Sequence, residues 1–154
     1  ALVAAGVAAG VGFDHMLEMQ LEVLARCKEQ GTWGKVGAIC QELLHEALPP
    51  DAAERCSGNV GVVVLQLQPT VERRTISTFV DNADLIQWLL ASCYIPFFLG
   101  PKPYLKYNDG VYIDGGIPAS PLPYVEGGAH EVHPFSVYPQ PLRNYSRGND
   151  PVSR

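Results

Sequence analysis

The segment that most constrains the fold is a short apolar run that ends in an acid and two glycines, Val-Tyr-Ile-Asp-Gly-Gly at residues 111–116. Asn108-Asp109-Gly110 comes directly before it and is a strong signal for a tight turn between two strands. With the β-branched and aromatic residues on either side, this turn predicts a β-hairpin over residues 104–113. Asp114 therefore lies where a strand ends and the chain turns sharply.

The carboxylate of Asp114 has two interpretations. Asp-Gly is ordinary turn chemistry, so Asp114 can simply begin a turn. Alternatively, Gly115 and Gly116 let another group come close to the carboxylate, as chemistry at a strand end requires. Taken alone, these six residues favour the turn.

The composition is that of a folded protein that does not bind nucleic acid. A length of 154 residues suits one domain with a core, and 47% apolar and 18% charged residues are globular values. The net charge of −5 argues against nucleic acid, because phosphate binding needs clustered Lys and Arg. The apolar residues 1–13 are too short to cross a bilayer and lack a basic leader, which predicts neither a transmembrane helix nor a signal peptide.

The cysteine and histidine spacings give no metal site. Four cysteines lie far apart without any Cys-x-x-Cys pair, which favours buried thiols and a reducing compartment over a disulfide framework: Cys27, Cys40, Cys56 and Cys93. His130 and His133 could be a ligand pair, but no third ligand follows at a usable spacing. We therefore expect no bound metal.

Apolar spacing predicts helices over residues 1–10, 14–30, 35–48 and 83–93, with a short helical turn from Asp51. The first helix is apolar all round, so we expect it to be buried. Strands are predicted over residues 60–67, buried on both faces, and 74–80, nearer an edge. Residues 1–126 then form the domain, and the Pro/Gly-rich residues 127–154 form a flexible tail. This order of elements predicts an α/β layered domain.

Two motifs together resemble the patatin-like phospholipase family, in particular its branch with the animal adipose triglyceride lipases. Residues 84–96, Asp-Leu-Ile-Gln-Trp-Leu-Leu-Ala-Ser-Cys-Tyr-Ile-Pro, match a family helix that ends in Ala-Ser-x-x-Ile-Pro. Residues 112–116, Tyr-Ile-Asp-Gly-Gly, match the family strand end Tyr-Val-Asp-Gly-Gly/Ala. The Asp of that motif is the acid of a Ser–Asp catalytic dyad, so the resemblance implies Asp114 as catalytic base, with Gly115 and Gly116 as its turn.

The resemblance covers most of residues 1–125 and implies a fold. It implies an α/β architecture of layered helices on a mixed, mostly parallel central sheet, here without its N-terminal strands. The family nucleophile lies in Gly-x-Ser-x-Gly at a strand-to-helix elbow, and an Ala-rich helix follows. Residues 1–10 match that helix, so the chain is expected to begin just after the elbow.

The chain departs from the family pattern in its nucleophile. Gly-x-Ser-x-Gly occurs nowhere in the 154 residues, and neither does the glycine-rich loop that supplies the oxyanion hole. Ser57, Ser92 and Ser120 are better interpreted as turn, helix and loop residues. After Gly116 the chain continues Ile-Pro-Ala-Ser-Pro, where the family usually proceeds toward an Asn before its Pro.

By this resemblance we expect a lipid acyl ester hydrolase without a cofactor, acting from the cytoplasm at a membrane or lipid-droplet surface. Four aromatic residues could line an acyl-chain channel or simply pack in the core: Trp88, Tyr94, Phe97 and Phe98. The alternatives are a non-catalytic lipid-associated remnant of the fold, with Phe97, Phe98 and Leu99 touching a membrane, and an unrelated α/β domain. The last would be favoured if Asp114 were exposed and far from the start of the first helix.

Overall fold

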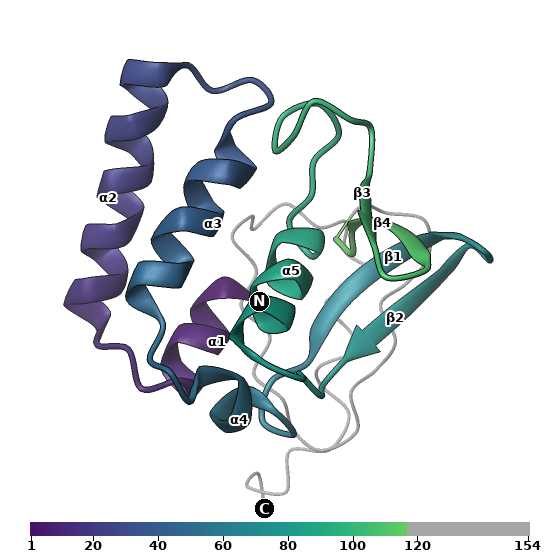
Figure 1. The fold of residues 1–154 in the computed structure, drawn as a ribbon, viewed down its shortest axis with the longest axis horizontal. Helices are drawn as coiled ribbons and strands as arrows, with labels where there is room; N and C mark the ends of the chain where they lie inside the picture. The colour runs from purple at the N-terminus through teal and green to yellow at the C-terminus, as the bar shows by residue number, and fades with distance from the viewer. Residues whose placement is uncertain (117–154) are drawn as a thin grey trace, which may run out of the picture. The chain divides into compact units, whose positions relative to one another are not determined.

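The computed structural model describes residues 1–116, which form five helices and four strands (Figure 1). The helices and strands are α1 (Leu2–Ala8), α2 (Phe13–Gln30), α3 (Val36–Ala47), α4 (Ala52–Cys56), β1 (Val62–Gln68), β2 (Glu72–Ile76), α5 (Asn82–Ala91), β3 (Leu105–Tyr107) and β4 (Gly110–Asp114). The expected domain boundary at residue 126 and the tail over residues 127–154 lie outside this part of the chain.

The four strands form one sheet in the order β2-β1-β4-β3, and all three pairings are antiparallel. The α/β class is confirmed, but these residues do not form the mostly parallel sheet that the resemblance implies. Short connections explain why two of these pairings are antiparallel: residues 69–71 join β1 to β2, and Asn108-Asp109 joins β3 to β4. Such short links fit antiparallel neighbours only, because a parallel pair needs a crossover of a dozen or more residues.

The predicted hairpin is confirmed. Tyr107 pairs with Gly110 across a two-residue turn, and Asn108 takes a positive φ of 47°, as turns of this kind require. The first predicted strand is also confirmed as a buried inner strand, β1. The second begins and ends earlier than expected, because after Ile76 the chain leaves the sheet and the Ser77 carbonyl accepts a hydrogen bond from the Gly58 N–H (2.8 Å).

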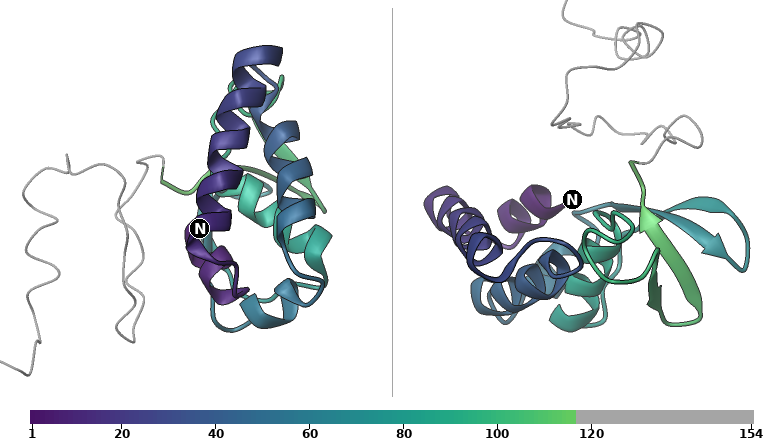
Figure 2. Two further views of the ribbon diagram at one scale, coloured as in Figure 1. Left: turned by 90° about the vertical axis from the view of Figure 1, so that its left-hand side faces the viewer. Right: turned by 90° about the horizontal axis from the view of Figure 1, so that it is seen from above.

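The helices gather on one side of the sheet (Figures 1 and 2), and α5 lies against it. Helix α5 starts with a built N-cap, in which the Asp81 carboxylate accepts from the Asp84 N–H (2.8 Å). Its Leu85, Ile86 and Leu89 are fully buried between the sheet and α3. Since burial of one such side chain contributes roughly 1.5–3 kcal/mol, α5 is the centre of the core and fixes the position of β4.

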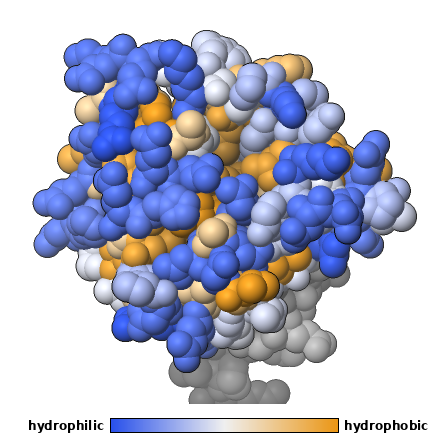
Figure 3. Space-filling view, in the orientation of Figure 1, coloured by the Kyte–Doolittle hydropathy of each residue, from blue (hydrophilic) through white to orange (hydrophobic). Residues whose placement is uncertain are grey.

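Helices α1 and α2 are less covered than their apolar patterns predict. In α1 only Ala5 and Gly6 are buried, whereas Val3 and Val7 are 53% and 64% exposed, so the expectation of burial all round is wrong. Helix α2 has no buried residue, and its Phe13 and Leu24 are largely exposed. Hydrophobic patches accordingly appear among hydrophilic residues on the surface in Figure 3. Packing covers only part of the surface of each helix. Periodicity alone does not show which part is covered.

Candidate active site

Asp114 ends β4, one of the two inner strands of the sheet. Its Cα partner is Val64 on β1, and its N–H donates to the carbonyl of Tyr94, just after α5, at 3.1 Å. The side chain is half-buried. A carboxylate fixed by the ladder on one side and by the end of α5 on the other meets the requirement that a general base be held rigidly.

The two glycines after Asp114 have separate functions in its turn. The Gly116 N–H donates to Asp114 Oδ1 at 2.7 Å, which orients the carboxylate. Gly115 is buried, and a Cβ at this position would collide with the backbone carbonyl of Val63. Within residues 1–116, Asp114 Oδ2 accepts no hydrogen bond.

The packing around Cys93 locates Asp114 relative to the start of α1. Burial, with smaller contributions from Cys40 and the Asp114 carboxylate, raises the pKa of Cys93 to about 12, and the amino group of Ala1 acts in the opposite direction. Leu2 of α1 and Ile113, the residue before Asp114, pack against the same buried cluster, which includes Leu90 and Tyr94. Figure 1 accordingly places the N-terminus beside α5. Asp114 therefore lies near the first helix. An unrelated fold would instead predict that the two are far apart.

The serines of the described residues near the core have structural functions. Ser57 Oγ donates to the Ala53 carbonyl (2.8 Å) and accepts from the Phe79 N–H (3.0 Å), which joins α4 to the chain after β2. Ser92 Oγ donates to the Leu89 carbonyl (2.7 Å) at the end of α5. Ser120 lies outside the described residues. Neither Ser57 nor Ser92 has a hydrogen bond to Asp114.

The four aromatic residues of the expected acyl channel do not form one pocket. Trp88 and Tyr94 are buried; Trp88 packs edge-on against two tyrosines of the hairpin, and the Tyr94 hydroxyl donates to the Lys102 carbonyl (3.0 Å). Phe98 is half-buried against Trp33, while Phe97 is 55% exposed. Trp88 and Tyr94 thus pack in the core, and Phe97 faces outward.

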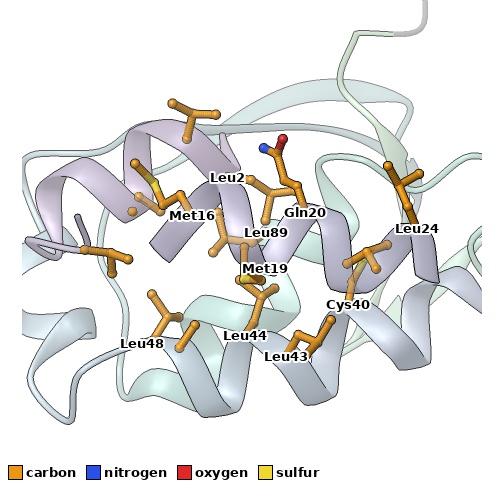
Figure 4. Close-up of a pocket in the computed structure, with 16 residues that line it drawn as sticks. Leu2, Met16, Met19, Gln20, Leu24, Cys40, Leu43, Leu44, Leu48 and Leu89 are labelled. Atoms are coloured by element: carbon orange, nitrogen blue, oxygen red, sulfur yellow. The ribbon is translucent and has the colours of Figure 1, made fainter. Parts of the chain in front are cut away.

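An apolar cavity of about 350 Å³ lies elsewhere, between α1, α2 and α3 (Figure 4). None of the four aromatic residues lines it. Gln20 supplies the one amide side chain in a lining otherwise made of aliphatic, small and sulfur-containing residues: Leu2, Val3, Ala5, Gly6, Val11, Met16, Met19, Val23, Leu24, Cys40, Leu43, Leu44, Ala47, Leu48 and Leu89. Its volume is in the range of ligand pockets.

The sequence carried a weak signal for this cavity. Gly6 brings the backbone of α1 so close to α2 that a Cβ there would collide with the sulfur of Met16. Met16 and Met19 are flexible, unbranched side chains that adapt to irregular spaces. A small residue on one helix and methionines on the next predict close but adaptable packing, yet they cannot indicate that a space remains.

Residues 1–116 contain no group of His, Cys, Asp and Glu that could hold a metal ion, and all four cysteines are free thiols. His130 and His133 lie outside the described residues. None of the helices in this part of the chain has the length and apolarity needed to cross a membrane.

The sequence profile of the family described as Patatin-like phospholipase matches residues 1–135, which is most of the chain. The chain belongs to the patatin-like phospholipase family. No solved structure matches it.

Human proteins of the patatin-like phospholipase family are similar to this chain. It is 33% identical over 94 residues (60% of the chain) to patatin-like phospholipase domain-containing protein 4. It is 24% identical over 131 residues (82%) to 1-acylglycerol-3-phosphate O-acyltransferase PNPLA3, and 30% identical over 132 residues (82%) to patatin-like phospholipase domain-containing protein 5. The matches cover 36%, 27% and 30% of these relatives, so the chain spans about a third of their length.

Proposed function

We propose that this chain supplies the catalytic base, Asp114, of a serine-type lipid acyl hydrolase. The observation that carries the proposal is the pairing of a rigidly held carboxylate with the start of α1. Asp114 is fixed by β1, by the Tyr94 carbonyl and by Gly116, and its neighbour Ile113 packs against the same buried cluster as Leu2 of α1.

The nucleophile in this proposal is a serine in a segment that precedes Ala1. Acyl transfer needs a nucleophile, a base within hydrogen-bond reach and donors for the oxyanion. A serine just before α1 would approach Asp114 and find Oδ2 free to accept its proton, while Gly116 keeps Oδ1 in place. The oxyanion donors would come from the same preceding segment.

We assign the acyl chain to the cavity between α1, α2 and α3. Leu2 lines that cavity and belongs to the first turn of α1, so an acyl group bonded just before α1 would meet the cavity at Leu2. An uncharged hydrocarbon suits a lining with a single amide side chain, because burying it there removes apolar surface from water. This replaces the four aromatic residues as the acyl site.

Active-site labelling of the full-length protein tests the proposal. A fluorophosphonate bonds covalently to an activated serine, and mass spectrometry of the digest identifies that residue. We expect the label on a Gly-x-Ser-x-Gly peptide that continues into Ala1-Leu2-Val3. A label on Ser57, Ser92 or Ser120, or a native N-terminus at Ala1 with no labelled serine, would overturn it and favour the non-catalytic alternative.

Acyl transfer is the second candidate, because one relative is named an acyltransferase. The same base and nucleophile would serve, with an alcohol in place of water as the acyl acceptor. Release of free fatty acid from a radiolabelled lipid with and without added lysophosphatidic acid separates the two: hydrolysis gives fatty acid in both assays, whereas transfer gives a diacyl product.

A further inference from the structure

Two loops present exposed aromatic side chains at one end of the structure. Trp33, between α2 and α3, is 75% exposed, and Phe97, between α5 and β3, is 55% exposed. The two loops lie side by side in Figures 1 and 2. Single exposed apolar residues are ordinary on a protein surface, but exposed aromatic residues on two adjoining loops mark a candidate interaction site.

The two loops are joined rigidly. The Gly34 N–H donates to the Phe98 carbonyl (3.0 Å), the Gly37 N–H donates to the Leu99 carbonyl (2.7 Å), and Trp33 packs edge-on against Phe98 at 5.8 Å. Phe97 has a positive φ of 64°, a conformation that a bulky residue adopts only when its surroundings enforce it. Its exposure is therefore a fixed feature of the loop.

The charge of these loops is opposite to that of the whole chain. Lys35 lies two residues after Trp33, and the loop over residues 92–104 contains Lys102 but no Asp or Glu; both lysines are exposed. Neither forms an ion pair within residues 1–116. The chain as a whole has a net charge of −5, so these two loops differ from it in the sign of their charge.

We propose that this aromatic rim, defined as Trp33 and Phe97 with Lys35 and Lys102, binds a lipid surface that carries anionic headgroups. Aromatic rings with a polar edge suit the boundary between headgroups and hydrocarbon, and lysines beside them attract anionic lipids. The exposed apolar side chains of α2 are the rival surface. They lie beside Asp14, Glu18 and Glu22, which an anionic surface repels, whereas the basic residues of α2, Arg26 and Lys28, lie nearer its end.

This inference extends the proposed function to the approach of the substrate. The loop of Phe97 begins after Tyr94, whose carbonyl accepts from the Asp114 N–H, so binding through the rim places the surface close to the acid. It does not depend on catalysis. Vesicles made of diether lipids, which contain no acyl ester, therefore test the rim separately from hydrolysis, and Asp114→Asn should bind them as the unchanged protein does.

Trp33 is itself the reporter, because the chain has only two tryptophans and the other, Trp88, is 7% exposed in the core. The chain is mixed with diether phosphatidylcholine vesicles, with and without diether phosphatidylserine, and with brominated lipid. We expect a blue shift and quenching of fluorescence with phosphatidylserine only, and loss of both in Trp33→Phe. In flotation, Trp33→Ala/Phe97→Ala should lower the partition coefficient about tenfold.

The matched control is Leu17→Ala/Leu21→Ala on exposed positions of α2, which should change partition less than about twofold. Circular dichroism and thermal unfolding verify that each variant folds. Any of four results would overturn the proposal. These are flotation without quenching of Trp33, equal binding to neutral vesicles, a larger loss of binding in the α2 variant, and no binding to any vesicle. The last result would favour a protein partner for the rim.

Discussion

The backbone N–H of Asp114 donates to the carbonyl of Tyr94 at 3.1 Å, which ties the end of β4 to the residue where the chain leaves α5. The two halves of the recognisable sequence, residues 84–96 and 112–116, thus meet at one hydrogen bond. Because α5 is anchored in the core by Leu85 and Leu89, the position of the carboxylate follows from the core.

Asp114→Asn should lower ester hydrolysis by the full-length protein about a thousandfold, because an amide cannot accept the proton of a nucleophile. The fold should be kept, since the Asn amide oxygen can still accept from the Gly116 N–H. Rates with a lipid ester and melting curves measure both effects.

Asp109→Asn is the matched control for that substitution. Asp109 is an exposed acid in the turn of the same hairpin, so the variant should retain the activity of the unchanged protein. Full activity in Asp114→Asn, or equal loss in both variants, would contradict the assignment of Asp114.

Local signals in the sequence predicted most of the elements. The Asn108-Asp109-Gly110 turn and the apolar spacing of α3 and α5 each report on nearby residues, and the structure confirms them. The mostly parallel sheet, which was inferred from the family, is not confirmed by residues 1–116, whose strand pairings are all antiparallel. The short link over residues 69–71 was the better local evidence, since it permits only an antiparallel pair.

The site was only partly predictable. Asp114 stood out because an acid and two glycines end a strand, a pattern that residues close in sequence carry. The cavity is built from α1, α2, α3 and Leu89 of α5, so its existence depends on how separate helices pack. Periodicity gives each helix an apolar face but does not say which helix packs against it. The sequence alone therefore does not single out Leu2 as a residue of the cavity.

Gly115→Ala should destabilise the protein by about 1–3 kcal/mol, because the added methyl group would overlap the Val63 backbone carbonyl, which cannot move without disturbing β1. Urea unfolding measures the loss. Gly12→Ala is the control: a Cβ at Gly12 would meet no atom within 4 Å, so the variant should differ by less than about 0.5 kcal/mol. Equal stability of the two variants would mean that the turn can relax around the methyl group.

Stability should fall in strongly alkaline solution because of Tyr107. Burial raises the pKa of Tyr107, and the hydrogen bond that its hydroxyl donates to Asp84 Oδ1 at 2.7 Å acts in the same direction. Together they raise the pKa from 10.0 to about 12. Below pH 10 the phenol is protonated in both the folded and the unfolded state. As the pH rises from 10 through 12, the unfolded state ionises first, so the free energy of unfolding falls.

Tyr107→Phe removes this ionisation and should flatten the fall in stability over the same pH range. The variant should be less stable at neutral pH by about 1–2 kcal/mol, because buried Asp84 loses a donor. Tyr104→Phe changes a tyrosine that is 38% exposed and should leave the pH profile unchanged. Urea unfolding at a series of pH values measures the free energy of unfolding of each variant. Identical profiles for Tyr107→Phe and the unchanged protein would refute the assignment of the alkaline loss of stability to Tyr107.

Met19→Trp should shorten the acyl chains that the full-length protein accepts. Met19 lines the cavity, and the bulkier indole in its place would narrow it. We expect hydrolysis of a palmitoyl ester to fall about tenfold, while that of a butyryl ester stays unchanged, because only the long chain needs the depth of the cavity. Leu21→Trp is the control on the same helix, since Leu21 is 57% exposed and does not line the cavity. If Met19→Trp slowed both esters equally, the acyl chain would have to lie elsewhere.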